Sequence, residues 1–210
     1  MRKVDVVDLH SGFFTNHGFV LNRSQLFFEK VFPHGKQVIF VNLVESSAAY
    51  FVEYHLAVRI HAVEELVQKF LPTPISYADQ SNTLSQTPDR LGNSYPKKIT
   101  VSDQVDFANI LNATEDFFLN KGFDWLNQMI DPVVLEKEFL FQSKRNKQDF
   151  NLVEAAFRAT ALSKLYNPED YQVLRQAFLE KIHSQDFTPF TIASFLQFLN
   201  HLDNEKQVAA

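Results

Sequence analysis

The feature that most constrains the fold is the alternation of side chains along residues 50–60. The even positions all carry apolar or aromatic side chains, whereas the odd positions include Glu53, His55 and Arg59. Successive side chains of a β-strand point to opposite faces of the sheet. The alternation therefore predicts a strand with one face in a core and a second, more polar face.

Two further strand-like runs precede this one. They cover residues 26–32 and 37–44, and turn-forming residues at 33–35 and 45–47 separate the three runs. Strands joined by such short turns pair antiparallel. The pattern predicts a β-meander, with a further strand at 97–101.

Apolar residues at helical spacing predict helices on both sides of these strands. The first covers residues 3–17 and ends at Gly18, with Phe19 packing back on the helix. The same string recurs at 117–123, which predicts a second helix end at Gly122. From residue 102 onward the spacing is helical throughout.

A helix is also predicted directly after the third strand. Residues 63–71 carry an apolar stripe, and Pro72 ends the helix. In this pattern Glu64 and Glu65 face solvent. His61 with Glu64 or Glu65 would place two metal ligands on one helix face, but a full ligand set is missing, so we expect no metal.

Strands therefore cluster in the first half of the chain and helices in the second, which is typical of an α+β fold. We expect residues 1–203 to form a single α+β domain, with a β-rich part at 1–101 and a helical part at 102–203. Residues 204–210 are expected to be a disordered tail. Two domains that meet near residue 102 are the alternative.

Several of these short segments occur together in an uncharacterised bacterial α+β family, a domain of unknown function that the chain resembles. The resemblance covers most of the first 130 residues. It rests on the helix before Gly18-Phe19, on the strands through Phe28, Val41 and Val58, on Phe70-Leu71, and on Gly122-Phe123-Asp124-Trp125-Leu126. It implies the same α+β fold and supplies no catalytic residues.

Composition excludes several classes of protein. With a net charge of −5 and only short basic clusters at 97–98 and 144–147, we expect no nucleic-acid partner. No apolar run reaches the roughly 20 residues that span a bilayer. The acids Asp5 and Asp8 interrupt the region that a signal peptide would need, so we expect a cytoplasmic protein without membrane contact.

The residues that build familiar catalytic and cofactor sites are scarce. The chain has no cysteine, and none of its 5 glycines belongs to a phosphate loop or dinucleotide fingerprint. We therefore expect no cofactor. The 22 phenylalanines indicate an aromatic core, with an aromatic interface or apolar pocket as the alternative.

The candidate ligand-binding residues are Glu53, His55 and Arg59, on one face of the third strand. Residues two apart on a strand are roughly 7 Å apart at Cα, so Glu53 could share a ligand with His55 or raise its pKa. Glu53 or His55 would serve as acid or base, and Arg59 as an anion clamp. A solvated sheet face with a cross-strand ion pair is the alternative.

Three functions follow from this pattern. The first is a non-catalytic protein-binding or regulatory module, such as an immunity protein, whose partner is another protein. The second is a small-molecule-binding protein or enzyme that uses Glu53, His55 and Arg59 under a lid formed by residues 72–98. The third is assembly with copies of itself.

Overall fold

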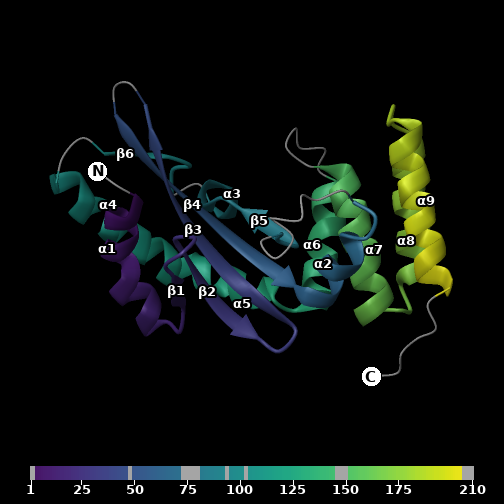
Figure 1. Cartoon of the computed structure of the whole chain (residues 1–210), viewed down its shortest axis with the longest axis horizontal. Coiled ribbons are helices and arrows are strands. Elements are labelled where there is room, and N and C mark those ends of the chain that lie inside the picture. Colours follow the sequence, from purple (N-terminus) through teal and green to yellow (C-terminus); the bar gives the residue numbers. More distant parts are fainter. Residues whose placement is uncertain are drawn as a thin grey trace. The chain divides into compact units, whose positions relative to one another are not determined.

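The computed structural model describes residues 3–46, 49–71, 81–92, 95–101, 104–144 and 151–204, with the side chains of 104–108 left aside. Within these ranges an antiparallel sheet occupies the N-terminal half, and most helices follow it (Figure 1). The predicted α+β fold is confirmed.

The chain forms two compact units. Unit 1 comprises Met1–Arg59 and Leu84–Ile130, and unit 2 comprises Ile60–Thr83 and Asp131–Ala210. The division does not follow the expected boundary at residues 101 and 102, because the helices between residues 104 and 129 belong with the sheet. That residues 1–203 form one domain stays a prediction.

The sheet of unit 1 has the neighbour order β1-β2-β3-β4-β5, and β6 also pairs with β4. Its longest strands, β3 and β4, together with β2 and β6, match predicted runs, whereas β1 and β5 were not predicted. The strands are β1 (Val20–Asn22), β2 (Phe27–Phe32), β3 (Gly35–Glu45), β4 (Tyr50–Ile60), β5 (Leu84–Gln86) and β6 (Ile99–Val101).

Helix α1 (Lys3–Asn16) ends as the sequence predicts. Gly18 adopts φ +84°, a left-handed conformation that glycine reaches without steric penalty. The Phe19 amide then donates to the Phe14 carbonyl at 3.0 Å, and the two rings lie 6.3 Å apart between centroids. These are the contacts of a Schellman motif.

The second predicted helix end is wrong. Helix α4 (Gln104–Phe117) continues through a π-helical turn, η2 (Phe118–Gly122), into α5 (Phe123–Met129). Gly122 has a helical φ of −63°. A Cβ atom there would lie 2.6 Å from Cδ1 of Phe118, so glycine makes room for an aromatic ring at this position rather than turning the chain.

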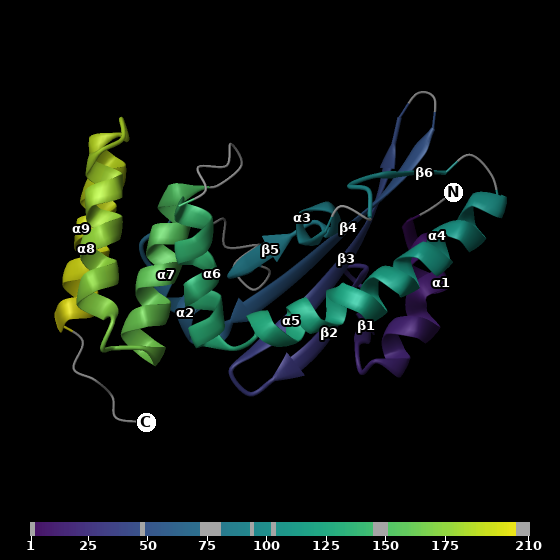
Figure 2. The same ribbon diagram turned by 180° about the vertical axis from the view of Figure 1, so that it is seen from behind.

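The core of unit 1 lies between the sheet and these helices. In Figure 2, α4 and α5 run across one face of the sheet. The Phe14 ring packs 4.8 Å from Phe28 of β2 and 4.9 Å from Phe118 of η2, between centroids. Phe118 in turn lies 5.3 Å from Phe123. Rings from helix and strand thus fill one core, as the phenylalanine content indicates.

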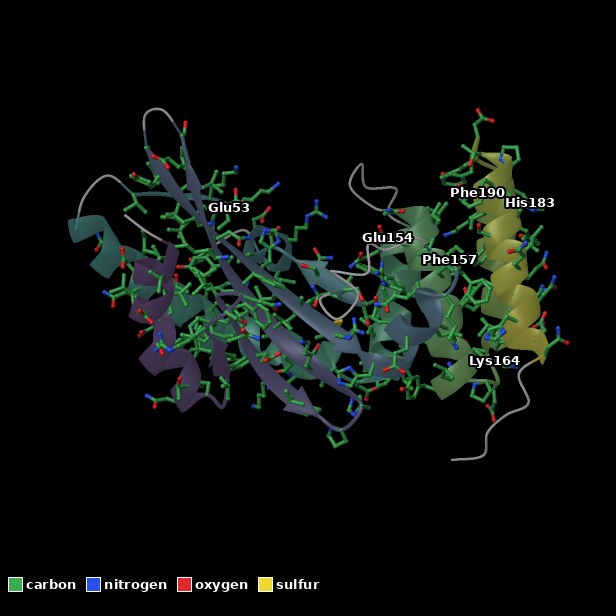
Figure 3. All side chains as sticks on the ribbon, in the orientation of Figure 1. Glu53, Glu154, Phe157, Lys164, His183 and Phe190 are labelled. Atoms are coloured by element: carbon green, nitrogen blue, oxygen red, sulfur yellow. The ribbon has the colours of Figure 1, made fainter. Side chains whose placement is uncertain are left out.

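Unit 2 is helical, and α7 is its central element, since it contacts α2, α6, α8 and α9. Phe157 of α7 lies 5.1 Å from Phe195 and 4.7 Å from Phe198, between ring centroids, and Figure 3 labels it on α7. The helices are α2 (His61–Val67), α6 (Pro132–Lys144), α7 (Leu152–Tyr166), α8 (Tyr171–His183) and α9 (Pro189–Asn204).

The remaining predictions concern the end of the helix after β4, the C-terminal tail, residues 72–98 and membrane-spanning segments. Helix α2 ends at Val67, four residues before the predicted end. Asn204 belongs to α9 and not to the predicted tail, of which residues 205–210 lie outside the described residues. The described part of the 72–98 segment contains β5 and the short helix α3 (Pro88–Leu91), whereas residues 72–80 and 93–94 lie outside it. Among the described helices, none has the length and apolar character to cross a membrane.

Candidate functional site

Two candidate sites emerge, one in each unit, and the first is the polar face of β4. Lys98 Nζ lies 2.7 Å from Glu53 Oε1, and His55 Nε2 lies 3.9 Å from Glu53 Oε2. The pairing of Val52 with Ile99 explains the first contact, because the next residues along this register are Glu53 and Lys98. Glu53 therefore takes part in the cross-strand ion pair that the sequence left open as an alternative.

The pKa of His55 is shifted in the direction opposite to the one expected from its neighbour Glu53. Burial lowers the pKa of its ring, Glu53 raises it, Lys97 lowers it and Asp89 raises it, and the net shift is downward. The expected upward shift from Glu53 is thus outweighed by loss of solvent. The ring is neutral at pH 7, so it can both donate and accept a hydrogen bond.

Arg59 lies apart from this pair. It stands four residues beyond His55 on β4, roughly 13 Å along a strand. It is also only 5% exposed, so its surroundings are those of a buried side chain. The structure therefore brings Glu53 and His55 together with Lys98 but separates them from Arg59.

Two buried oxygens without a hydrogen-bond partner lie just beyond β5, the strand that pairs with β4 near His55. They are Oγ1 of Thr87 and Oδ1 of Asp89, at the start of α3. Leu56 pairs with Gln86, so the next residues along that register are His55 and Thr87. Buried polar atoms normally have partners, and such atoms indicate a place where water or a ligand group is bound.

The second candidate site is a pocket of about 370 Å³ in unit 2, between α2 and the start of α7. Its wall combines charged, polar and apolar side chains. The lining residues are Glu64, Val67, Gln68, Leu71, Ser81, Asn151, Val153, Glu154 and Arg158.

The guanidinium of Arg158 organises the charges of this pocket. Its Nε donates to Glu64 Oε1 at 2.8 Å, and Nη2 donates to Glu64 Oε2 at 3.2 Å. Its Nη1 donates to Glu154 Oε2 at 2.6 Å. Burial lowers the pKa of Arg158. The charges and hydrogen bonds of Glu64 and Glu154 together raise this pKa by more than burial lowers it, so the net shift is upward. The side chain stays charged.

Exposure increases from the inner to the outer side of this charged group. The side chain of Glu64 is 1% exposed, that of Arg158 13%, and that of Glu154 51%. Glu154 also accepts from Nδ2 of Asn151 at 2.9 Å, while the Asn151 side chain caps α7 by accepting from the Glu154 amide at 3.2 Å. Figure 3 labels Glu154 on α7. Glu154 is therefore the accessible carboxylate of this pocket, and Glu64 is the buried one.

Sequence reasoning missed this pocket. It overlooked Arg158 and Glu154, and it placed Glu64 toward solvent, which is wrong because Glu64 is buried against Arg158. A signal was present: Val67 and Leu71 stand three and seven residues after Glu64, on the same side of the helix that the sequence predicts. The spacing of Glu154 and Arg158, four residues apart, is the second signal.

The spacing of His61 and Glu64 in the sequence would suit two ligands of one metal ion. In the structure both carboxylate oxygens of Glu64 accept hydrogen bonds from Arg158. Within the part of the chain that the structure describes, no group of three or more His, Cys, Asp or Glu side chains is arranged to hold a metal ion.

The resemblance to an uncharacterised bacterial family stays a prediction. Comparison of the chain with protein-family models, with curated proteins and with solved structures found no match.

Proposed function

We propose that this protein acts by binding rather than by catalysis, and that the pocket between α2 and α7 holds its ligand. One observation carries the proposal: an Arg158–Glu64 ion pair with both carboxylate oxygens engaged forms part of the lining of a pocket of about 370 Å³. Small-molecule sites usually measure roughly 300–1,000 Å³ and combine an apolar wall with a few fixed polar groups.

The chemistry of the pocket suits binding better than proton transfer. Arg158 keeps its proton, because its pKa is raised, and Glu64 and Glu154 hold its guanidinium in place. A charged group that is fixed in this way orients a ligand without gaining or losing a proton. The ligand is either a side chain of another protein or a small molecule. We propose a cytoplasmic setting, with which a chain without cysteine is compatible because it needs no oxidising compartment to form disulfides.

Methyl spectra provide the test. Protein with ¹³C-labelled Val and Leu methyl groups is titrated with n-butylammonium, butyrate and n-butanol, which share one size and differ in charge. We expect at least one probe to shift the methyl signals of Val67, Leu71 and Val153 in a saturable way, while those of Val38 and Val52 in the sheet stay unchanged.

A filled pocket supplies the control. Val153→Phe places a ring in the pocket and is expected to abolish the shifts of Val67 and Leu71. Val173→Phe, at an exposed position of α8, is expected to leave them intact. If no probe moves the pocket methyl groups, or if both variants respond alike, the pocket is not a binding site.

A second candidate is the small-molecule site on β4, and the unpartnered oxygens of Thr87 and Asp89 favour it. Asp89 Oδ1 requires a donor and the Thr87 hydroxyl can donate or accept, so the N–H or O–H groups of a ligand could bind both near the neutral ring of His55. The same titrations test this site through the ring signals of His55. Shifts of these signals that disappear in Asp89→Asn support it, and an unresponsive ring with every probe refutes it for this chemistry.

A further inference from the structure

We propose that the group bound in the α2–α7 pocket is a primary alkylammonium, the group that ends a lysine side chain. This inference rests on the proposed function, that the pocket binds a ligand, and it specifies the chemistry of that ligand. It follows from the charges, the free acceptor positions and the apolar wall of the pocket.

The charges of the lining residues do not cancel. Glu64 and Glu154 carry two negative charges, Arg158 carries one positive charge, and the other described lining residues are neutral. The described lining residues therefore carry a net charge of −1 while their own ion pairs stay intact. A ligand with one positive charge neutralises it, whereas an anion would add to the excess.

The helix end beside the pocket does not reverse this preference. The N-terminus of α7 carries partial positive charge, which by itself would attract an anion. However, Glu154 lies in the first turn of α7, and the Asn151 side chain already accepts from the Glu154 amide. The helix N-terminus is thus supplied with a carboxylate and a cap from its own sequence.

Glu154 has acceptor positions to offer. A carboxylate has about four lone-pair sites, and Glu154 uses one for Arg158 Nη1 and one for Asn151 Nδ2. Its side chain is 51% exposed, so an incoming donor can reach it. Glu154 is therefore the residue that we expect to contact the bound cation.

Ammonium fits the pocket better than guanidinium does. A guanidinium binds most strongly to a carboxylate through two parallel hydrogen bonds, and at Glu154 each oxygen already accepts one bond, from Arg158 Nη1 and from Asn151 Nδ2. An ammonium group is a compact donor that needs one oxygen at a time. The alkyl chain behind it matches the apolar side chains of Val67, Leu71 and Val153.

The test compares the affinities of four probes of similar size: n-butylammonium, n-butylguanidinium, n-butanol and butyrate. Dissociation constants are read from the Val67 and Val153 methyl signals. We expect n-butylammonium to bind most tightly. Glu154→Gln is expected to weaken its binding about tenfold, since it removes a charged acceptor. The matched control is Glu180→Gln, at an exposed position of α8, which is expected to change nothing.

The two sources of an alkylammonium are separated by a further probe, a blocked Gly-Lys-Gly peptide. Tighter binding of the peptide than of n-butylammonium assigns the site to a lysine of a partner protein, and tighter binding of the free amine assigns it to a small molecule. Both outcomes support the ammonium assignment.

Other results overturn it. If butyrate, n-butanol or n-butylguanidinium binds the pocket more tightly than n-butylammonium does, the pocket binds a ligand but its assignment to ammonium is wrong. If Glu154→Gln retains the parent affinity with unchanged methyl spectra elsewhere, Glu154 is not the contact and the inference fails. If no probe binds, the proposed function fails with it.

Discussion

Arg158 of α7 holds both carboxylate oxygens of Glu64 on α2, with Nε–Oε1 and Nη2–Oε2 distances of 2.8 and 3.2 Å. The two residues are 94 positions apart in the chain. Glu64 is fully buried, so this ion pair satisfies a carboxylate that has lost its water. It joins the two helices that form the pocket.

The first prediction concerns the stability of this pair. Arg158→Met leaves the buried Glu64 carboxylate without its partner and is expected to lower the free energy of unfolding by about 3–5 kcal/mol, as for other broken buried pairs. Urea unfolding followed by circular dichroism measures this change. The double variant Glu64→Gln/Arg158→Met is expected to be more stable than Arg158→Met alone. Together with Glu64→Gln alone, these variants form a double-mutant cycle. Strictly additive effects of the two substitutions on the free energy of unfolding would contradict a coupled pair.

The second prediction concerns acid sensitivity. His10 is 1% exposed, shares a 2.7 Å hydrogen bond with the hydroxyl of Tyr54, and has a second ring nitrogen without a partner. Burial lowers the pKa of its ring from 6.5 to about 4. Between these pH values the unfolded chain binds a proton that the folded protein does not, so stability falls as the pH falls.

The size of this loss can be measured. The difference between a pKa of 6.5 in the unfolded chain and one of about 4 in the folded protein corresponds to about 3 kcal/mol of unfolding free energy. Below pH 4 this residue contributes no further loss. Unfolding free energies measured across this range should show a smaller decrease for His10→Gln than for the parent. His183→Gln, on the exposed face of α8, is the control and should follow the parent curve. Equal slopes for all three proteins would refute the role of His10.

The third prediction compares two glycines within helical segments. Gly122→Ala brings a Cβ atom to 2.6 Å from the Phe118 ring and is expected to lower the stability by about 1–3 kcal/mol through overpacking. Gly12 of α1 has open space at the same position, so Gly12→Ala is expected to raise the stability by about 0.5–1 kcal/mol. The midpoint temperature of thermal unfolding should therefore fall for Gly122→Ala and rise for Gly12→Ala. A shift of both midpoints in the same direction would contradict this account.

The fourth prediction separates the three residues of β4. Glu53→Ala and His55→Ala are expected to change the stability by about 1 kcal/mol or less, because Lys98, the partner of Glu53, is half exposed. Arg59→Ala is expected to lower it by about 1–3 kcal/mol, because this side chain is buried. Denaturant unfolding of the three variants provides the measurement. Large losses in Glu53→Ala and His55→Ala would show that these residues hold the fold together and are poor candidates for binding.

The success of the sequence predictions depended on how local the signal was. The alternation along residues 50–60 predicted β4 with its bounds, and Gly18-Phe19 predicted the end of α1. Both patterns act through neighbouring residues, either by the alternation of a strand or by a single left-handed conformation. The short strands β1 and β5 had no such pattern, because pairing partners elsewhere in the chain define them.

Similar local strings had different outcomes in the fold. Gly122 repeats the surroundings of Gly18, yet it keeps a helical φ of −63° and its helix continues through η2 into α5. Glu53 and Lys98 form an ion pair only because β6 pairs with β4 in the observed register. The sequence indicated that Glu53 and His55 share one face, and the structure identified the partner.

The sequence by itself determined the α+β class, the meander of β2, β3 and β4, and the polar character of one face of β4, because periodicity and turn chemistry are properties of adjacent residues. The tertiary structure alone decided that Glu64 is buried and that Arg158 pairs with it. A carboxylate on a helix can face water or a core, and only the packing of a second helix provides the cation that makes its burial stable.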